Sequence, residues 1–227
     1  MCKMRVGILL FDEVEELDFV GPLEVFGVAS RLVQSLSVLT VSKDGRPIQG
    51  RYGLRVQPNY RIADCPPLDI LIVPGGKGAS EHARYDKELV AFVKTHASKQ
   101  QIASICTGAL VLAEAGILTG RRATTHHSAL DMLRQYADVH VVEGARFVLD
   151  NGVATSAGIS AGIDLALELV RRHFGEKVAQ GVADTLEYPY HLHNPPSDTH
   201  EIAVQRKNVK CVCAPMDREA ASWNCMF

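Results

Sequence analysis

Short, almost continuously apolar segments alternate along the chain with amphipathic segments of helical length. The clearest runs are residues 6–10, 69–73 and 102–105, and a further strand is predicted at 36–42. Apolar runs of this kind are typical of strands that are buried on both faces of a parallel sheet. Because helical segments separate them, the pattern predicts an α/β fold with a doubly wound, mostly parallel sheet and helices on both faces.

Proline, glycine and serine residues suggest where other elements begin and end. Pro22 is expected in the first turn of a helix, and Gly45 and Gly53 predict a hairpin of edge strands. Ser80 is expected to cap a helix over residues 81–97. The remaining predictions are helices at 108–113, 127–136 and 158–174, and strands at 139–142 and 146–149.

The α/β pattern ends near residue 190. A length of 227 residues fits one domain with an extension, so we expect a domain at 1–190 and an arm, dimer-embracing segment or tail at 191–227. The hydrophobic fraction of 47% and the charged fraction of 22% exclude wholesale disorder.

Charge and hydropathy limit the expected partners and compartment. A formal net charge of −2 gives no electrostatic reason to expect nucleic acid or an anionic membrane surface as a partner. No apolar run reaches the ~20 residues that a membrane helix needs, and no signal peptide is visible. Six cysteines do not demand a disulfide scaffold. We therefore expect a cytoplasmic protein with reduced thiols.

Cys106 lies where a buried strand passes directly into a helix. The apolar run at 102–105 ends at this cysteine, and the helical segment begins at Gly108. Such a junction predicts a sharp turn like the serine elbow of hydrolases, with the side chain above the sheet edge. The partial positive charge of a helix N-terminus favours a thiolate there. The alternative is a buried structural cysteine.

Two further segments are candidates for the same edge of the sheet. Gly75 and Gly76 end a central strand, where their backbone N–H groups either bind a developing anion or simply form a tight turn. The acidic stretch at 12–18 is interpreted mostly as a solvated loop. Asp18 differs, because it lies between apolar neighbours at the entry to a helix. A carboxyl buried beside a thiolate would have a raised pKa and would be able to donate a proton.

Histidines and cysteines near the C-terminus allow a weaker hypothesis. His191, His193, Cys211 and Cys213 are of the residue types that bind zinc, but their short spacings and polar context do not favour a metal site. We therefore predict no metal and no cofactor. His126 and His127 are candidates for a general base, but His127 opens a predicted helix and is equally plausible as a capping or packing group.

Five motifs together resemble the DJ-1/ThiJ/PfpI superfamily of class I glutamine-amidotransferase-like domains, over roughly residues 4–190. They are LDFVGPLEVF at 17–26, IVPGG at 72–76, SICTGA at 104–109, LTGRRATTHH at 118–127 and TSAGISAGID at 155–164. Within the superfamily, the chain is most similar to isonitrile hydratases and to the sensory domains of AraC-type regulators. The resemblance implies a flavodoxin-like sheet, a homodimer and a small-molecule substrate.

The resemblance also implies roles for individual residues. Cys106 matches the nucleophile, and Asp18 matches the acid that hydrogen-bonds it in the hydratase group. Gly76, next to Gly75, and the backbone of Thr107 match the oxyanion-binding positions. The matching pocket-lining residues are His126, Thr155, Ser156 and Gly158.

The chain departs from the superfamily pattern at two points. The PfpI proteases carry a histidine directly after the nucleophile, where this chain has Thr107, so proteolysis is not expected. About 37 residues follow Tyr190, too few for the helix-turn-helix domain of AraC-type regulators, so direct DNA binding is not expected.

The leading hypothesis is an isonitrile hydratase-like enzyme that converts an isonitrile to an N-substituted formamide through a thioimidate on Cys106. A second hypothesis is another cysteine-dependent activity of the superfamily, of the glyoxalase or deglycase type. A third is a non-catalytic ligand or redox sensor in which Cys106 is oxidised to a sulfinate.

Overall fold

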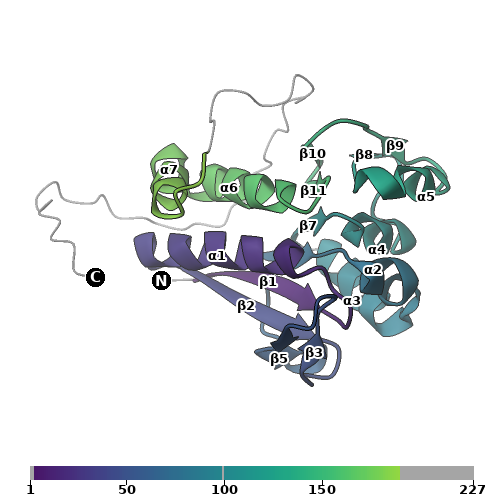
Figure 1. The fold of residues 1–227 in the computed structure, drawn as a ribbon, viewed down its shortest axis with the longest axis horizontal. Coiled ribbons are helices and arrows are strands. Elements are labelled where there is room, and N and C mark those ends of the chain that lie inside the picture. The colour runs from purple at the N-terminus through teal and green to yellow at the C-terminus, as the bar shows by residue number, and fades with distance from the viewer. Residues whose placement is uncertain (1–2, 99, 190–227) are drawn as a thin grey trace, which may run out of the picture.

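A seven-stranded sheet runs through the protein in the computed structural model, which describes residues 3–98 and 100–189 (Figure 1). The strand order is β10-β11-β7-β6-β1-β2-β5, and every neighbouring pair is parallel except β10 and β11. The strands are β1 (Met4–Leu10), β2 (Leu36–Ser42), β5 (Tyr60–Arg61), β6 (Ile70–Val73), β7 (Gln101–Ile105), β10 (Phe147–Asp150) and β11 (Val153–Ser156). The predicted doubly wound, mostly parallel sheet is confirmed.

Helices cover both faces of this sheet. On one face α1, α6 and α7 pack against one another, and on the other face α3 and α4 contact β7 while α2 packs against α4 (Figure 1). The helices are α1 (Glu16–Leu32), α2 (Lys77–Glu81), α3 (Lys87–Ala97), α4 (Gly108–Glu114), α5 (Leu130–Arg134), α6 (Ala161–Phe174) and α7 (Glu176–Thr185). Short 3-10 turns occupy η1 (Ile62–Asp64), η2 (Ala83–Tyr85) and η3 (His127–Ala129).

The core consists of the central strands and the helix faces that cover them. Ile8 in β1, Leu71 in β6 and Ala103 in β7 are fully buried. Burying an isoleucine or leucine side chain completely contributes about 1.5–3 kcal/mol relative to leaving it exposed. The strands with continuous apolar sequence are thus the strands with helices on both sides, which explains why the sequence pattern identified them.

Two predicted helix starts are wrong. Helix α1 begins at Glu16, so Pro22 lies inside the helix and not in its first turn. The helix predicted at 81–97 is three elements, α2, η2 and α3, and the residue that caps α3 is Asp86 rather than Ser80. The Asp86 carboxylate accepts hydrogen bonds from two backbone N–H groups of the first turn of α3, which satisfies donors that the helix itself leaves unpaired.

The predicted hairpin exists, but it does not form an edge of the main sheet. Strands β3 (Ile48–Gln49) and β4 (Arg55–Val56) make a separate two-stranded antiparallel sheet, and the edge of the main sheet is β5. A second small sheet pairs β8 (Arg122–Ala123) with β9 (His140–Val141). The turn between β3 and β4 carries Arg51, which proves important for the site.

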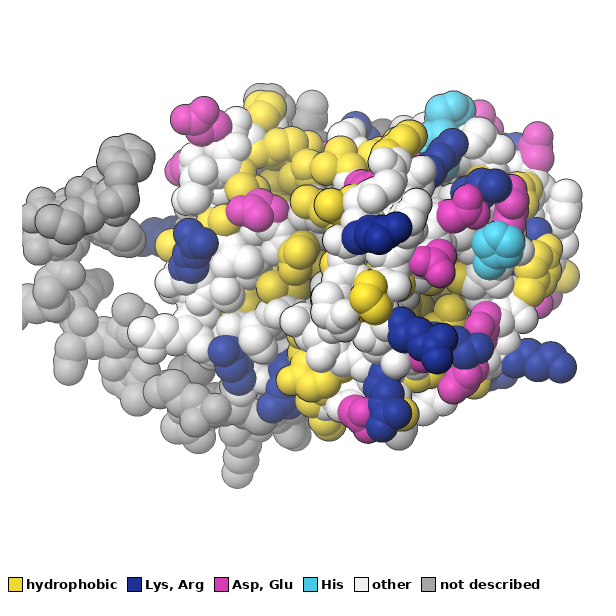
Figure 2. All heavy atoms as spheres, turned by 60° about the horizontal axis from the view of Figure 1, so that its bottom comes forward, with side chains coloured by type: hydrophobic (Ala, Val, Ile, Leu, Met, Phe, Trp, Pro, Cys, Tyr) yellow, Lys and Arg dark blue, Asp and Glu magenta, His cyan; other side chains and the backbone are white. Residues whose placement is uncertain are grey.

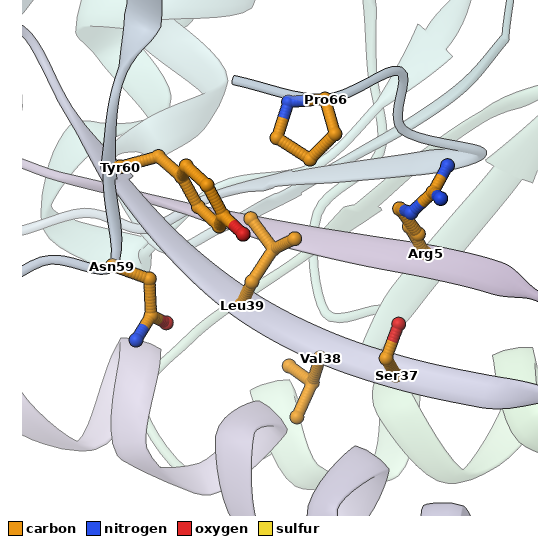
Figure 3. Close-up of a pocket in the computed structure, with 7 residues that line it drawn as sticks. All are labelled: Arg5, Ser37, Val38, Leu39, Asn59, Tyr60 and Pro66. Carbon is orange, nitrogen blue, oxygen red and sulfur yellow. The ribbon is translucent and has the colours of Figure 1, made fainter. Parts of the chain in front are cut away.

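A cavity of about 440 Å³ lies where β2 and β5 form the edge of the sheet (Figure 3). The connection from β2 to β6 contains no long helix, so this part of one sheet face has no helix over it. Ser37 and Leu39 point into the cavity, whereas Val38 between them points toward the helices on the other face (Figure 3). None of the predicted site residues lines this cavity. The lining residues are Arg5, Ser37, Val38, Leu39, Asn59, Tyr60 and Pro66.

The surface carries side chains of both charges (Figure 2). Acidic and basic side chains are interspersed on the face shown in Figure 2 rather than gathered by sign. Within the described residues, no helix combines the length and the apolar character that crossing a bilayer requires. The predicted extension at 191–227 lies outside the described residues, and so do the four histidines and cysteines considered as metal ligands.

Candidate active site

Cys106 occupies the sharp turn between β7 and α4, as the strand-to-helix junction predicted. Its φ of +54° lies in the left-handed region, which a residue with a side chain rarely adopts. The backbone is held on both sides: the Cys106 N–H donates to the Ser156 carbonyl oxygen at 3.1 Å, and the Thr125 hydroxyl donates to the Cys106 carbonyl oxygen at 2.8 Å. Such a conformation costs about 1–3 kcal/mol and persists where surrounding contacts fix it.

Glycines allow the chain segments at 73–75 and 158 to lie very close to this turn. A Cβ atom at Gly158, whose φ is +72°, would lie 2.2 Å from the Cβ of Cys106. A Cβ atom at Gly75 would lie 2.5 Å from the Thr107 nitrogen, and one at Gly108 would lie 2.1 Å from the Val73 carbonyl oxygen. No side chain fits at these distances. The backbone at 75 and 158 therefore forms two walls around the cysteine, and α4 can begin directly against the end of β6.

Asp18 lies on the buried side of the first turn of α1 and points into the same region. Its side chain is fully buried, and the Gly75 N–H donates to its Oδ2 atom at 3.0 Å. Burial raises the pKa of Asp18 to about 7, because a carboxylate loses its hydration there. The Gly75 N–H opposes this rise, the charge of Glu15 adds to it, and the interaction with the Cys106 thiol lowers the pKa of Asp18.

The resting thiol differs from the thiolate that the helix N-terminus led us to expect. Burial, together with the charge of Asp18, raises the pKa of Cys106 to about 12, although hydrogen bonds from the Thr107 backbone and side chain act in the opposite direction. The cysteine is 6% exposed, so desolvation of the charged sulfur outweighs the partial charge of the short helix α4. At neutral pH the sulfur therefore keeps its proton, and the Asp18 carboxyl titrates much closer to neutrality than an exposed carboxyl does.

The predicted oxyanion donors already have partners in the structure. The Gly76 N–H donates to the Thr107 Oγ1 atom at 2.9 Å, and the Thr107 hydroxyl donates back to the Gly76 carbonyl oxygen at 3.0 Å. The Gly75 N–H is bound to Asp18, and the Thr107 N–H interacts with the cysteine sulfur. The structure thus brings all of these groups to one place, and their role as anion donors stays a prediction.

The predicted pocket-lining residues lie around the same turn at different distances from the sulfur. Ser156 and Gly158 flank Cys106 directly through the backbone contacts described above. Thr155 is buried, and its Oγ1 atom accepts from the Thr124 N–H at 2.9 Å, which ties β11 to the segment after β8. His126 follows that segment and caps η3, and its Nδ1 atom lies 2.8 Å from the Ser128 hydroxyl. Burial, His127 and Arg51 lower the pKa of His126.

Sequence reasoning missed two charged residues of the site. Glu15, interpreted as part of a solvated acidic loop, is only 5% exposed. Its Oε2 atom lies 3.3 Å from the Nη1 atom of Arg51, which comes from the β3–β4 hairpin. The spacing of Glu15 and Asp18 was an available signal, because residues three apart share one face of a helix. Arg51 offered no local signal.

Comparisons with known proteins agree with this geometry. Residues 4–172 match the DJ-1/PfpI family. The chain is 39% identical over 186 residues to an isonitrile hydratase of Pseudomonas putida, covering 82% of this chain and 78% of that protein. It is 26% identical to the HTH-type transcriptional regulator GbdR of Pseudomonas aeruginosa over 81% of this chain, which spans half the regulator's length.

A solved structure shows the same fold. The crystal structure of a THiJ/PfpI family protein from Pseudomonas syringae matches with a TM-score of 0.76 and 30% identity, covering 87% of this chain and 79% of that one. The family match covers well over half of the chain, and the similarity to the hydratase extends across most of both sequences. The chain therefore belongs to the DJ-1/PfpI family.

Proposed function

We propose that this protein is a cofactor-independent, isonitrile hydratase-like enzyme that adds water to an isonitrile, R–NC, to give the formamide R–NH–CHO. The observation that carries the proposal is the fully buried Asp18 carboxyl, which is held by the Gly75 N–H and is electrostatically coupled to the Cys106 thiol. The similarity to the hydratase of Pseudomonas putida supports the same reaction.

The first step moves one proton from sulfur to carbon. The Asp18 carboxylate takes the proton of the Cys106 thiol, and the thiolate attacks the terminal carbon of the isonitrile. Asp18 then gives the proton to that same carbon, which leaves the thioimidate R–N=CH–S–Cys106 and an unchanged carboxylate. A group with a pKa of about 7 suits both directions of this transfer, because general acids and bases work best near the operating pH.

The second step releases the product with water. A water molecule attacks the thioimidate carbon, Asp18 accepts a proton from it, and the nitrogen is protonated. The resulting R–NH–CH(OH)–S–Cys106 loses the hydroxyl proton as the carbon–sulfur bond breaks. The products are R–NH–CHO and the Cys106 thiol, so the enzyme returns to its starting state and one water is consumed in each cycle.

Substrate turnover with matched cysteine variants tests this proposal. Purified protein is given an alkyl isonitrile, and the formamide is measured by chromatography. Cys106→Ala and Asp18→Asn are expected to lower kcat by at least about a hundredfold, since each removes a group that takes part in proton transfer or bond formation. Cys65→Ala is the control, because Cys65 is the other free cysteine among the described residues and its thiol pKa is raised to about 11 by burial alone.

The alternatives have distinct outcomes in the same set of proteins. Absence of formamide, together with Cys106-dependent consumption of methylglyoxal, would replace the proposal with a glyoxalase-type activity. Absence of both, with selective oxidation of Cys106 to a sulfinate under mild peroxide, would favour a sensor. Formation of formamide by Cys106→Ala at the wild-type rate would remove the cysteine from the mechanism.

The resemblance also leads us to propose a homodimer that acts on a small molecule. Sedimentation equilibrium of the purified protein distinguishes a dimer from a monomer without depending on the substrate.

A further inference from the structure

An ion pair between the buried Glu15 and the half-exposed Arg51 lies at the start of the helix that carries Asp18. The Glu15 side chain is 7% exposed and sits at the N-cap position of α1. Among the described residues, its basic neighbour at ion-pair distance is Arg51, whose Nη1 atom lies at 3.3 Å and whose side chain is 49% exposed. A carboxylate so deeply buried loses most of its hydration, and a paired cation compensates part of that loss.

The chain holds Arg51 in place through backbone contacts. The Arg51 N–H donates to the Val14 carbonyl oxygen at 2.9 Å, and the next N–H, that of Tyr52, donates to the Glu16 Oε1 atom at 2.6 Å. The turn of the β3–β4 hairpin is therefore bound to the residues that start α1. The position of the guanidinium over Glu15 follows from these contacts and not from the ion pair alone.

Glu15 and Asp18 belong to the same helical turn. The Asp18 N–H donates to the Glu15 carbonyl oxygen at 3.1 Å, and both side chains are buried. The titratable groups that act on Asp18 are Glu15 from its own helix and Cys106 from the β7–α4 turn. Arg51, from the hairpin, acts on Glu15 and also on His126, which follows β8.

We propose that Glu15, paired with Arg51, is a positioning residue that determines where the shared proton of the Cys106–Asp18 pair resides. Its negative charge disfavours the Asp18 carboxylate and so favours the arrangement in which sulfur is ionised and Asp18 carries the proton. That arrangement is the one in which sulfur is nucleophilic. Arg51 influences the Cys106–Asp18 pair only through Glu15, whose charge it stabilises in a buried place. This role deepens the proposed function, and it is testable on the thiol without any isonitrile.

Alkylation of Cys106 by iodoacetamide, followed by peptide-resolved mass spectrometry from pH 5.5 to 9, provides the test. In the wild type, the rate should rise with pH and level off above about pH 7, where Asp18 has released its proton. The variant Glu15→Gln keeps the size of the side chain and removes its charge. Asp18 should then ionise about one pH unit lower, and the plateau rate should fall about tenfold.

The rate at the acidic end distinguishes this role from a structural one. Below the pKa of Asp18, this carboxyl is already protonated when the thiolate forms. The charge of Glu15 therefore has little effect on the alkylation rate in this pH range. Glu15→Gln should therefore match the wild type within about twofold at pH 5.5 while falling about tenfold at pH 8. A fall of equal size at every pH would show damage to the site, and superimposable profiles would show no coupling. Either result overturns the proposal.

Two further variants distinguish the charge of Glu15 from the docking of the hairpin and test the indirect role of Arg51. Glu16→Gln is the matched control, because Glu16 anchors the same hairpin turn through Tyr52 but is not among the groups that shift Asp18. It should keep the wild-type profile, and the same change as in Glu15→Gln would attribute the effect to hairpin docking. The double variant Glu15→Gln/Arg51→Met should match Glu15→Gln alone, and any additional change would refute the indirect role of Arg51.

If wild-type protein hydrates no isonitrile, the proposed function fails while these profiles still test Glu15.

Discussion

The wild-type protein should lose stability as the pH rises because Asp18 ionises, and the variant Asp18→Asn should not show this loss. The variant should therefore become more stable relative to the wild type as the pH rises. The folded protein holds Asp18 with a pKa of about 7, whereas the group titrates near 3.8 without the fold. Between these values the folded state binds more protons at Asp18 than the unfolded state does, so ionisation of this group lowers the free energy of unfolding as pH rises. Below pH 4 both states are protonated and the contribution disappears.

The size of the effect follows from the displacement of the pKa. A difference of about three pH units corresponds to about 4 kcal/mol, because each unit is worth about 1.4 kcal/mol. Asp18 is fully buried, so solvent does not screen this value. Asparagine has nearly the same shape, and its Oδ1 atom can still accept from the Gly75 N–H. Its amide nitrogen would occupy the place of Asp18 Oδ1, for which the described residues offer no conventional hydrogen-bond partner.

Urea denaturation of both proteins from pH 4 to pH 8.5 measures this prediction. Any cost of packing the asparagine is the same at every pH, so the informative quantity is the change of the difference between the two free energies of unfolding. That difference should move in favour of Asp18→Asn by about 4 kcal/mol between pH 4 and pH 8. Cys106 stays protonated throughout this range and adds nothing. A difference that does not change with pH would mean that Asp18 titrates normally and that the proton-transfer argument is wrong.

Two predictions concern the backbone around the nucleophile. Gly158→Ala should lower the alkylation rate of Cys106 and the proposed hydratase rate at least about tenfold, and it should lower the free energy of unfolding by about 2 kcal/mol or more. The reason is that the new Cβ would lie 2.2 Å from that of Cys106, at a residue whose φ is +72°. Near-normal reactivity would show that the segment moves aside freely. Cys106→Gly should be about 1 kcal/mol more stable than Cys106→Ala, because glycine adopts a φ of +54° without strain. Equal midpoints for these two variants would indicate that the elbow stores no strain.

The central part of the fold was predictable because its signals are local. Strands β1, β6 and β7 are mostly apolar, and such near-continuous apolar runs are typical of strands whose two sheet faces are both covered. The elbow was predictable for the same reason, since a buried strand ends at Cys106 and a helix follows within two residues. In both cases a few consecutive residues determine the structure.

Helix starts and the charge states were less predictable, because they depend on distant residues. Helix α1 accommodates a proline in its interior, so the position of Pro22 did not indicate where the helix begins. Glu15 looked like part of a solvated loop, and it is buried because Arg51 reaches it from 36 residues away. Helix position alone predicted a thiolate at Cys106, whereas the degree of burial, which depends on the whole fold, leaves the resting sulfur protonated.

The arrangement of backbone donors distinguishes between the reactions that a cysteine elbow can perform. Acyl transfer develops a negative oxygen, and catalysis requires N–H groups that are free to bind it. Here the Gly75 N–H binds Asp18, and the Gly76 N–H binds the Thr107 hydroxyl. Addition of a thiol to an isonitrile instead develops negative charge on carbon, which a proton neutralises directly. The proposed proton exchange between the buried Asp18 carboxyl and the sulfur would meet that requirement, and the Gly75 N–H, a predicted oxyanion donor, holds this carboxyl in place.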